Sequence, residues 1–135
     1  MATLISNEQI VTTLQTQLPE LLAVYVFGSQ AQGTAGPASD LDLAVLVAGI
    51  AEPVRLWELA QTLAGLAGCE VDLLDLRAAS TVMQYQIITT GTRLWEKNVQ
   101  AAIFESVILS EKTELDTARA ALLADIQREG TVYGR

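Results

Sequence analysis

Two short apolar segments joined by a loop of small residues constrain the fold of this chain most. Residues 21–27 (LLAVYVF) are apolar and partly β-branched, which is typical of a buried strand. Residues 40–47 (DLDLAVLV) begin with strict alternation of acidic and apolar side chains, which predicts a second strand. Residues 28–39 (GSQAQGTAGPAS) are rich in breakers and predict a connecting loop, with room for one helical turn after Ser29.

Helical and strand patterns alternate along the rest of the chain. Ser6 and Gln9 form a capping-box pattern that starts a helix ending before Pro19. Pro53 favours the first turn of a second helix, which Gly68 closes. Further along, the pattern predicts a third strand, a helix, a short strand and a long helical segment at residues 69–76, 78–90, 93–96 and 99–127. We therefore expect one α/β domain with a trailing helical segment.

Size and composition exclude several classes of protein. With 135 residues the chain suits one domain with a real core. No apolar run approaches the ~18 residues that span a bilayer, and no secretory signal is recognisable at the start. The single cysteine, Cys69, cannot form an internal disulfide, which fits a cytoplasmic protein. The absence of histidine excludes mechanisms that use a histidine base or metal ligand.

The charge balance disfavours a nucleic-acid substrate or an anionic membrane. Sixteen acidic and eight basic side chains give a formal net charge of -8. The basic residues are spread along the chain, so they form no phosphate-binding cluster in the sequence. A bound divalent cation would suit such a chain better than a bound polyanion.

Asp40 and Asp42 are the first candidate site residues. Side chains two apart on a strand share a face, with Cα atoms roughly 6.6 Å apart. Two carboxylates so placed repel each other unless a cation lies between them, and a hard ion such as Mg²⁺ meets that need. An isolated D-x-D is more often just a polar strand start.

Gly28 and Ser29 change that assessment. They follow a buried strand directly, where the chain must turn and expose N–H groups that can bind a phosphate. Alone, a Gly-Ser pair at this point is more often a plain tight turn. Together, the two features put phosphate donors and metal-binding carboxylates at the same end of neighbouring strands, which is far more specific than either.

A third acid is expected to complete the site, and the segment CEVDLLDL supplies Asp72 and Asp75. Asp72 lies in mid-strand between apolar residues, where a carboxylate is costly unless it is paired or binds metal. Asp75 is near the strand end, where solvent exposure or helix capping is the more common role. The two face opposite sides of the strand, and we expect Asp72 to belong to the site.

These residues carry a resemblance to a known family. Gly28-Ser29, ten intervening residues and Asp40-Leu41-Asp42 resemble the signature of the DNA polymerase beta superfamily of nucleotidyltransferases. The details resemble its minimal nucleotidyltransferases, the MntA-type antitoxins of HEPN–MNT toxin–antitoxin systems. The likeness is densest over residues 25–47, continues through CEVDLLDL and IITTGTRLWE, and covers roughly residues 5–97.

The resemblance implies a nucleotidyltransferase domain over residues 1–97, with a small mixed sheet packed by helices, and a helical extension over 98–135. It implies that Asp40, Asp42 and Asp72 are catalytic and bind Mg²⁺ or Mn²⁺. It implies that Gly28 and Ser29 hold the triphosphate of ATP. The implied reaction transfers AMP to a tyrosine of a HEPN-domain ribonuclease toxin, which neutralises the toxin.

Gln32 departs from the family pattern. Many members have arginine at this position of G-S-x-A-R-G, and its loss would weaken nucleotide binding unless Arg77 or Arg93 compensates. Two alternatives to protein adenylylation therefore stay open. One is a non-catalytic antitoxin that masks its toxin by binding, and the other is an enzyme that transfers a nucleotide to a small molecule.

The C-terminal segment and the tryptophans allow further predictions. The segment has apolar residues at helical spacing that pack either on its own domain or on a partner: Ile103, Val107, Ile108, Leu115, Leu122 and Ile126. The acidic chain would suit a basic, RNA-binding partner. Trp57 and Trp95 lie within apolar patterns, and we expect both in the core.

Overall fold

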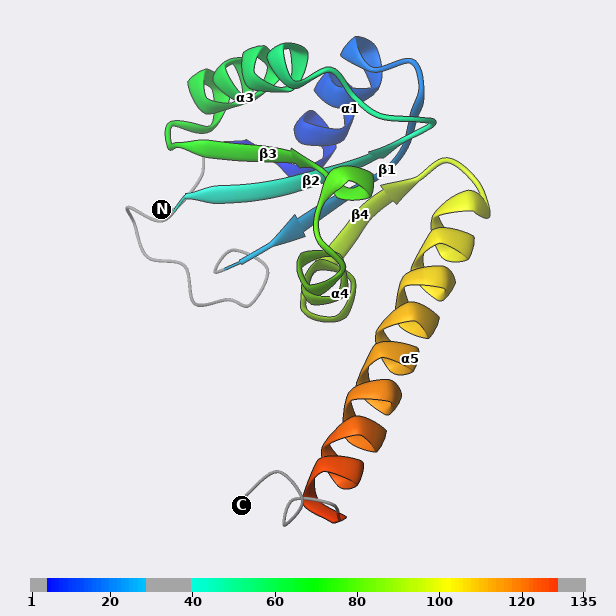
Figure 1. Cartoon of the computed structure of the whole chain (residues 1–135). Helices are drawn as coiled ribbons and strands as arrows, with labels where there is room; N and C mark the ends of the chain where they lie inside the picture. The colour runs from blue at the N-terminus through cyan, green and yellow to red at the C-terminus, as the bar shows by residue number, and fades with distance from the viewer. Residues whose placement is uncertain (1–4, 29–39, 129–135) are drawn as a thin grey trace.

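A mixed four-stranded sheet forms the centre of the molecule (Figure 1). The computed structural model describes residues 5–28 and 40–128. The strands are β1 (Leu21–Phe27), β2 (Leu41–Val47), β3 (Val71–Asp75) and β4 (Thr92–Glu96), in the order β3-β2-β1-β4. β1 is antiparallel to β2 and β4, and β2 is parallel to β3. The mixed sheet implied by the family resemblance is confirmed.

Helices cover both faces of this sheet (Figure 1). On one face lie α1 (Asn7–Gln17) and α3 (Pro53–Ala67), and on the other lie α4 (Thr81–Thr90) and the start of α5 (Gln100–Arg128). A short 3₁₀ helix, η1 (Leu76–Ala78), follows β3. No helix within residues 5–28 and 40–128 has the length and apolar character needed to cross a membrane.

Alternation along β2 divides the core into two clusters. Leu41, Leu43 and Val45 pack with α1 and α3. Ala44 and Leu46 pack with α4 and the start of α5. Because successive side chains of a strand point to opposite faces, Asp42 shares the face of Ala44 and Leu46. The carboxylate of Asp42 is thereby directed to the side of the sheet that α4 and α5 cover.

Local signals set the ends of the helices. The Ser6 hydroxyl accepts the Gln9 N–H at 3.1 Å, and the Gln9 side chain accepts the Ser6 N–H at 2.8 Å, which completes the predicted capping box. Pro53 opens α3, and Gly68 ends it in the left-handed region at φ 74°. These predicted boundaries are confirmed.

A partly buried polar contact holds α5 against the sheet. The Tyr25 hydroxyl and the Arg93 guanidinium both donate to the same carboxylate oxygen of Glu105, each at 2.6 Å. Burial, and then the hydrogen bond and charge of Glu105, raise the pKa of Tyr25 above its ordinary value, so the phenol stays protonated as the donor. The first turns of α5 therefore have a fixed position on β1 and β4.

Trp57 contradicts the prediction that it lies in the core. Its side chain is 65% exposed, whereas Trp95 is half-buried against the core. The buried positions of α3 follow helical spacing through Leu56, Leu59 and Leu63, and Trp57 falls outside that row. The high apolar content of the whole helix concealed this difference.

Leu63 tests how much stability the core on the α3 face supplies. It is fully buried, so Leu63→Ala should lower the free energy of unfolding by about 3 kcal/mol through lost burial and a residual cavity. Leu66→Ala, on the exposed side of the same helix, should change it by less than about 0.5 kcal/mol. Urea denaturation followed by circular dichroism measures both, and equal losses would contradict the described packing of α3.

Candidate active site

The end of β1 and the starts of β2 and β3 meet in one row across the sheet. Phe27 is the register partner of Asp42 on β2, and Asp42 is the register partner of Asp72 on β3. Gly28 follows Phe27 directly. Antiparallel pairing on one side of β2 and parallel pairing on the other thus bring a glycine turn and two carboxylates to the same end of these three strands.

Gly28 is required by its position against Asp42. Its φ is 73°, in the left-handed region that glycine adopts without strain. A Cβ at this position would run into the Asp42 carboxylate. The backbone after β1 can therefore approach the carboxylate closely only because the residue has no side chain.

Asp42 and Asp72 are an interacting pair of carboxyl groups. Partial burial raises the pKa of Asp42, and the charge of Asp72 and hydrogen bonding with it raise the pKa further. Asp72 itself is exposed. The pair thus concentrates negative charge at the starts of β2 and β3, with Asp42 partly shielded from water.

Asp40 is exposed and stands just before β2. Its charge makes the smallest contribution to the raised pKa of Asp42, and it also raises the pKa of the Cys69 thiol, after the larger effect of burial. Within residues 5–28 and 40–128, no three acidic or cysteine side chains gather closely enough to enclose a metal ion. Asp42 with Asp72 is therefore the tight pair, and Asp40 is a neighbour of it.

The donor set of this pair fits a hard divalent cation. Carboxylate oxygens are the ligands that Mg²⁺ prefers, and it commonly uses one or two of them together with substrate phosphates and water. A cation beside Asp42 and Asp72 would also relieve the repulsion that raises the pKa of Asp42. An enclosed cage of three protein ligands is not needed for such a site.

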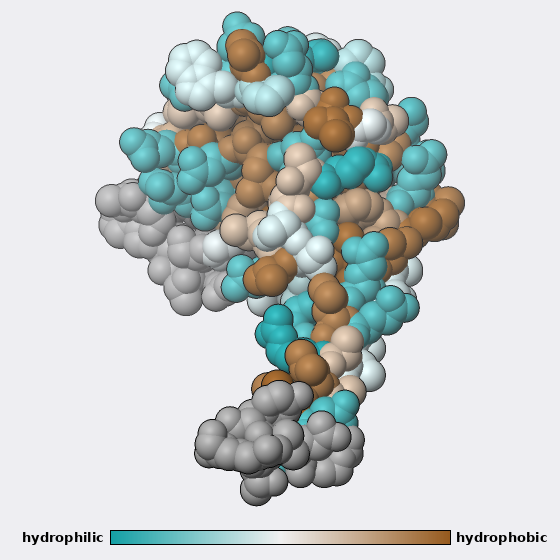
Figure 2. All heavy atoms as spheres, in the orientation of Figure 1, coloured by the Kyte–Doolittle hydropathy of each residue, from teal (hydrophilic) through white to brown (hydrophobic). Residues whose placement is uncertain are grey.

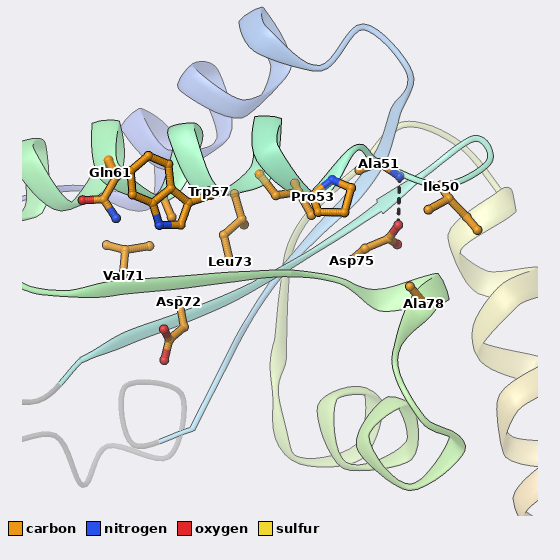
Figure 3. A pocket seen from close by; sticks show the side chains of 12 residues that line it. Ile50, Ala51, Pro53, Trp57, Gln61, Val71, Asp72, Leu73, Asp75 and Ala78 are labelled. Carbon is orange, nitrogen blue, oxygen red and sulfur yellow. Dashed lines mark hydrogen bonds between the residues drawn. The ribbon is translucent and has the colours of Figure 1, made fainter.

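Asp75 has a structural role on the opposite face of β3. Its carboxylate is buried and accepts the N–H of Ala51 at 2.9 Å and the N–H of Arg77 at 3.0 Å, which caps η1 (Figure 3). Figure 3 shows Asp72 and Asp75 pointing away from opposite sides of the strand. Helix capping was one of the two roles expected for Asp75.

Arg77 and Arg93 could supply the positive charge that is missing at Gln32, but both interact with other groups. Arg77 donates to the carbonyl of Val47 at 3.2 Å, at the far end of β2 from Asp42, and its guanidinium lies 5.2 Å from the centre of the Phe104 ring. Arg93 is held by Glu105, as described above. Ser29, Gln32 and the helical turn expected after Ser29 lie outside the described residues.

A groove beside the site was missed from the sequence. It has a volume of about 390 Å³ and lies between α3 and the edge strand β3, where Trp57 and Gln61 face Val71 and Leu73 (Figure 3). Asp72 contributes to its lining, but its carboxylate points to the other face of the sheet. The signal in the sequence that could have indicated this groove is the position of Trp57, which lies outside the row of buried residues in α3.

A mixed sheet with a glycine turn beside paired aspartates is the arrangement of a nucleotidyltransferase. Residues 8–100 match the family described as Polymerase beta, Nucleotidyltransferase, and the chain belongs to this family. More narrowly, it is 38% identical to the protein adenylyltransferase MntA of Shewanella oneidensis (strain MR-1), over 90% of this chain and 88% of that protein. The predicted family is thereby confirmed.

Solved structures agree with this relationship. A toxin–antitoxin crystal structure with AMP-PNP superposes with a TM-score of 0.80 at 37% identity and covers 91% of this chain and 99% of that one. An MntA toxin–antitoxin complex with two aspartates, two positions apart, changed to glutamate gives 0.79 at 36% identity, with coverage of 91% and 99%. The tri-AMPylated Shewanella oneidensis HEPN toxin in complex with MNT antitoxin gives 0.72 at 35%, with coverage of 90% and 95%.

Repulsion between the paired carboxylates should lower the stability of the protein, which two variants can test. Without divalent metal, Asp42→Asn should raise the free energy of unfolding by about 1 kcal/mol, because functional like-charge pairs reduce stability. Asp75→Asn should lower it by about 2 kcal/mol, because an amide cannot accept both N–H groups equally well. Urea denaturation in EDTA measures both variants, and a destabilised Asp42→Asn would contradict the repulsion.

Gly28 makes a second prediction from the site. Gly28→Ala should lower the free energy of unfolding by about 2 kcal/mol, because left-handed backbone is unfavourable with a Cβ and the methyl group meets Asp42. It should also weaken ATP binding, measured by calorimetry with Mg²⁺. Gly65→Ala is the control, since open space surrounds Gly65 in α3, and this variant should gain about 0.5 kcal/mol.

Proposed function

We propose that this protein is an antitoxin that transfers AMP from ATP to a tyrosine of a cognate HEPN ribonuclease toxin and thereby neutralises it. The observation that carries the proposal is the pairing of Asp42 with Asp72 beside the Gly28 turn. The 38% identity to a protein adenylyltransferase, and solved relatives with AMP-PNP and with an AMPylated toxin, support the same reaction. ATP and the RNA that such a toxin cleaves are both in the cytoplasm, where we propose that the protein works.

Each site residue has a role in this proposal. The backbone at Gly28 and Ser29 holds the triphosphate, and Asp40, Asp42 and Asp72 hold Mg²⁺ or Mn²⁺. The metal, when bound, supplies positive charge that offsets the charge of the phosphates. In a solved MntA complex, two aspartates two positions apart were changed to glutamate, and their spacing is the same as that of Asp40 and Asp42.

The chemistry is a substitution at the α-phosphorus of ATP. The tyrosine oxygen forms a bond to this phosphorus, the bond to the β-phosphate oxygen breaks, and pyrophosphate leaves with its electrons. The phenolic proton must pass to a base or to water. We assign this acceptor role to Asp72, because it is the exposed member of the pair and can reach a substrate hydroxyl from solvent.

Transfer to the toxin is measured directly by mass. With ATP, Mg²⁺ and its cognate HEPN toxin, the protein should increase the toxin mass by one or more AMP units. Asp40→Asn/Asp42→Asn should lower the rate by about a hundredfold or more, because it removes charge that holds the metal. Glu58→Gln, an exposed acid on α3, should retain the wild-type rate.

Other outcomes of this experiment select the other functions. Inhibition of the toxin without any mass change would show that the protein masks its toxin by binding, and the catalytic proposal would be wrong. Transfer to a small molecule when this protein alone is present would identify an enzyme of the antibiotic-modifying kind. EDTA should abolish transfer and leave the fold intact.

A further inference from the structure

The helix α5 has two parts with different surroundings. In its first part, Ala101 and Ile108 are buried and Phe104 is half-buried against α4 and the sheet. Its later turns extend beyond the domain, as Figure 1 shows. Every residue from 113 to 127 is exposed. The domain therefore uses only the beginning of a 29-residue helix for its own packing.

The face of α5 that packs on the domain continues into the projecting part. Ala101 and Ile108 are seven residues apart, and the next members of the series are Leu115 and Leu122. Seven residues make almost two full turns, so these four side chains lie within a narrow stripe along the helix. Leu115 is 55% exposed and Leu122 is 60% exposed. Ile126, one turn further on, widens this stripe.

A helix with one uncovered apolar face is not stable by itself in water. Helices gain most of their stability from packing such a face, and short isolated helices are marginal. Figure 2 shows apolar side chains between polar ones on the projecting part of α5. We define the projecting stripe as Leu115, Leu122 and Ile126, and it requires a cover that the described part of this chain does not supply.

The direction of the stripe indicates where that cover lies. Ala101 packs in the cluster that contains Ala44 and Leu46 of β2, and Asp42 is on the same face of β2 as these two residues. The stripe continues the face of Ala101, so by helical spacing it is directed to that side of the sheet. A protein seated on the stripe is therefore on the same side as the paired carboxylates.

The charges around the stripe indicate the chemistry of the cover. Glu111 and Glu114 lie on one side of the stripe and Lys112 and Arg119 on the other, so the acidic character comes from the whole chain, which has a formal net charge of -8. A protein that binds and cleaves RNA presents basic residues to the phosphates, so it complements this surface. A second copy of this acidic chain would bring like charges together.

We propose that the projecting stripe of α5 is the docking surface for the toxin and holds it on the side of the sheet from which its tyrosine reaches Asp42 and Asp72. This inference rests on the proposed function for the identity of the partner. It divides α5 into a part that belongs to the domain and a part that folds stably against the partner. The stripe raises affinity for the toxin and takes no part in the chemical step.

The double variant Leu115→Glu/Leu122→Glu tests the proposal. Both positions are exposed and glutamate favours helix, so the domain should stay folded, as circular dichroism will check. Its dissociation constant for the HEPN toxin, measured by calorimetry without ATP, should rise at least tenfold. With ATP, kcat/KM for the toxin should fall by the same factor, and kcat at saturating toxin should stay unchanged.

Ser110→Glu/Thr117→Glu is the matched control. These positions are exposed, are also seven residues apart and lie on the opposite side of α5. The control adds the same charge, so its toxin affinity should stay within about twofold of wild type. Equal affinity of the two double variants for the toxin would overturn the inference.

Two further outcomes separate the inference from the proposed function. If wild type and Leu115→Glu/Leu122→Glu transfer AMP equally well at low toxin concentration, the function holds and the docking surface is wrong. If nothing transfers AMP but only this variant loses toxin affinity, the docking surface holds and the catalytic proposal fails. A self-associated chain that this variant dissociates, with toxin affinity unchanged, would identify a second copy as the cover and also overturn the inference.

Discussion

The pairing of β2 with strands on both sides is the constraint on which the site depends. Antiparallel pairing brings the end of β1 beside the start of β2, and parallel pairing brings the start of β3 beside the start of β2 as well. Residues 43–47 of β2 are buried, so packing on both faces fixes this strand in place. The sheet therefore holds Gly28, Asp42 and Asp72 together although the charges of the two carboxylates repel each other.

The three positions Asp42, Asp72 and Asp75 show how strand alternation assigns different tasks to one residue type. Asp42 and Asp72 share a face and are register partners, so the charge of Asp72 adds to the effect of burial in raising the pKa of Asp42. Asp75 is three residues after Asp72 and turns to the other face, where two backbone N–H groups satisfy its buried carboxylate. The charges of Asp42 and Asp72 repel each other, which is expected of residues retained for binding, whereas hydrogen bonds satisfy Asp75, which is expected of a residue retained for folding.

Much of this arrangement follows from local patterns, and the rest depends on long-range packing. Pro53 and Gly68 marked the ends of α3 correctly, because capping acts within a few residues. The directions of the strands did not follow from local patterns, and the mixed sheet was expected only from the family resemblance. The exposure of Trp57 and of Leu115 depends on what lies opposite each helix face, and helical spacing alone cannot say whether a face is covered by its own domain or by a partner. Whether Asp40, Asp42 and Asp72 act together remains a prediction from both sequence and geometry.

The distribution of positive charge constrains how this protein would hold ATP. Residues 28–39 contain no lysine or arginine. Arg77 is held at the far end of β2, and Arg93 is used to fasten α5 through Glu105. In the proposed function, the charge of the triphosphate is therefore offset by divalent metal at the carboxylates and by backbone N–H groups at Gly28 and Ser29. A basic toxin seated on α5 would add positive charge on the same side of the sheet, so binding of the protein acceptor and of the nucleotide would favour each other.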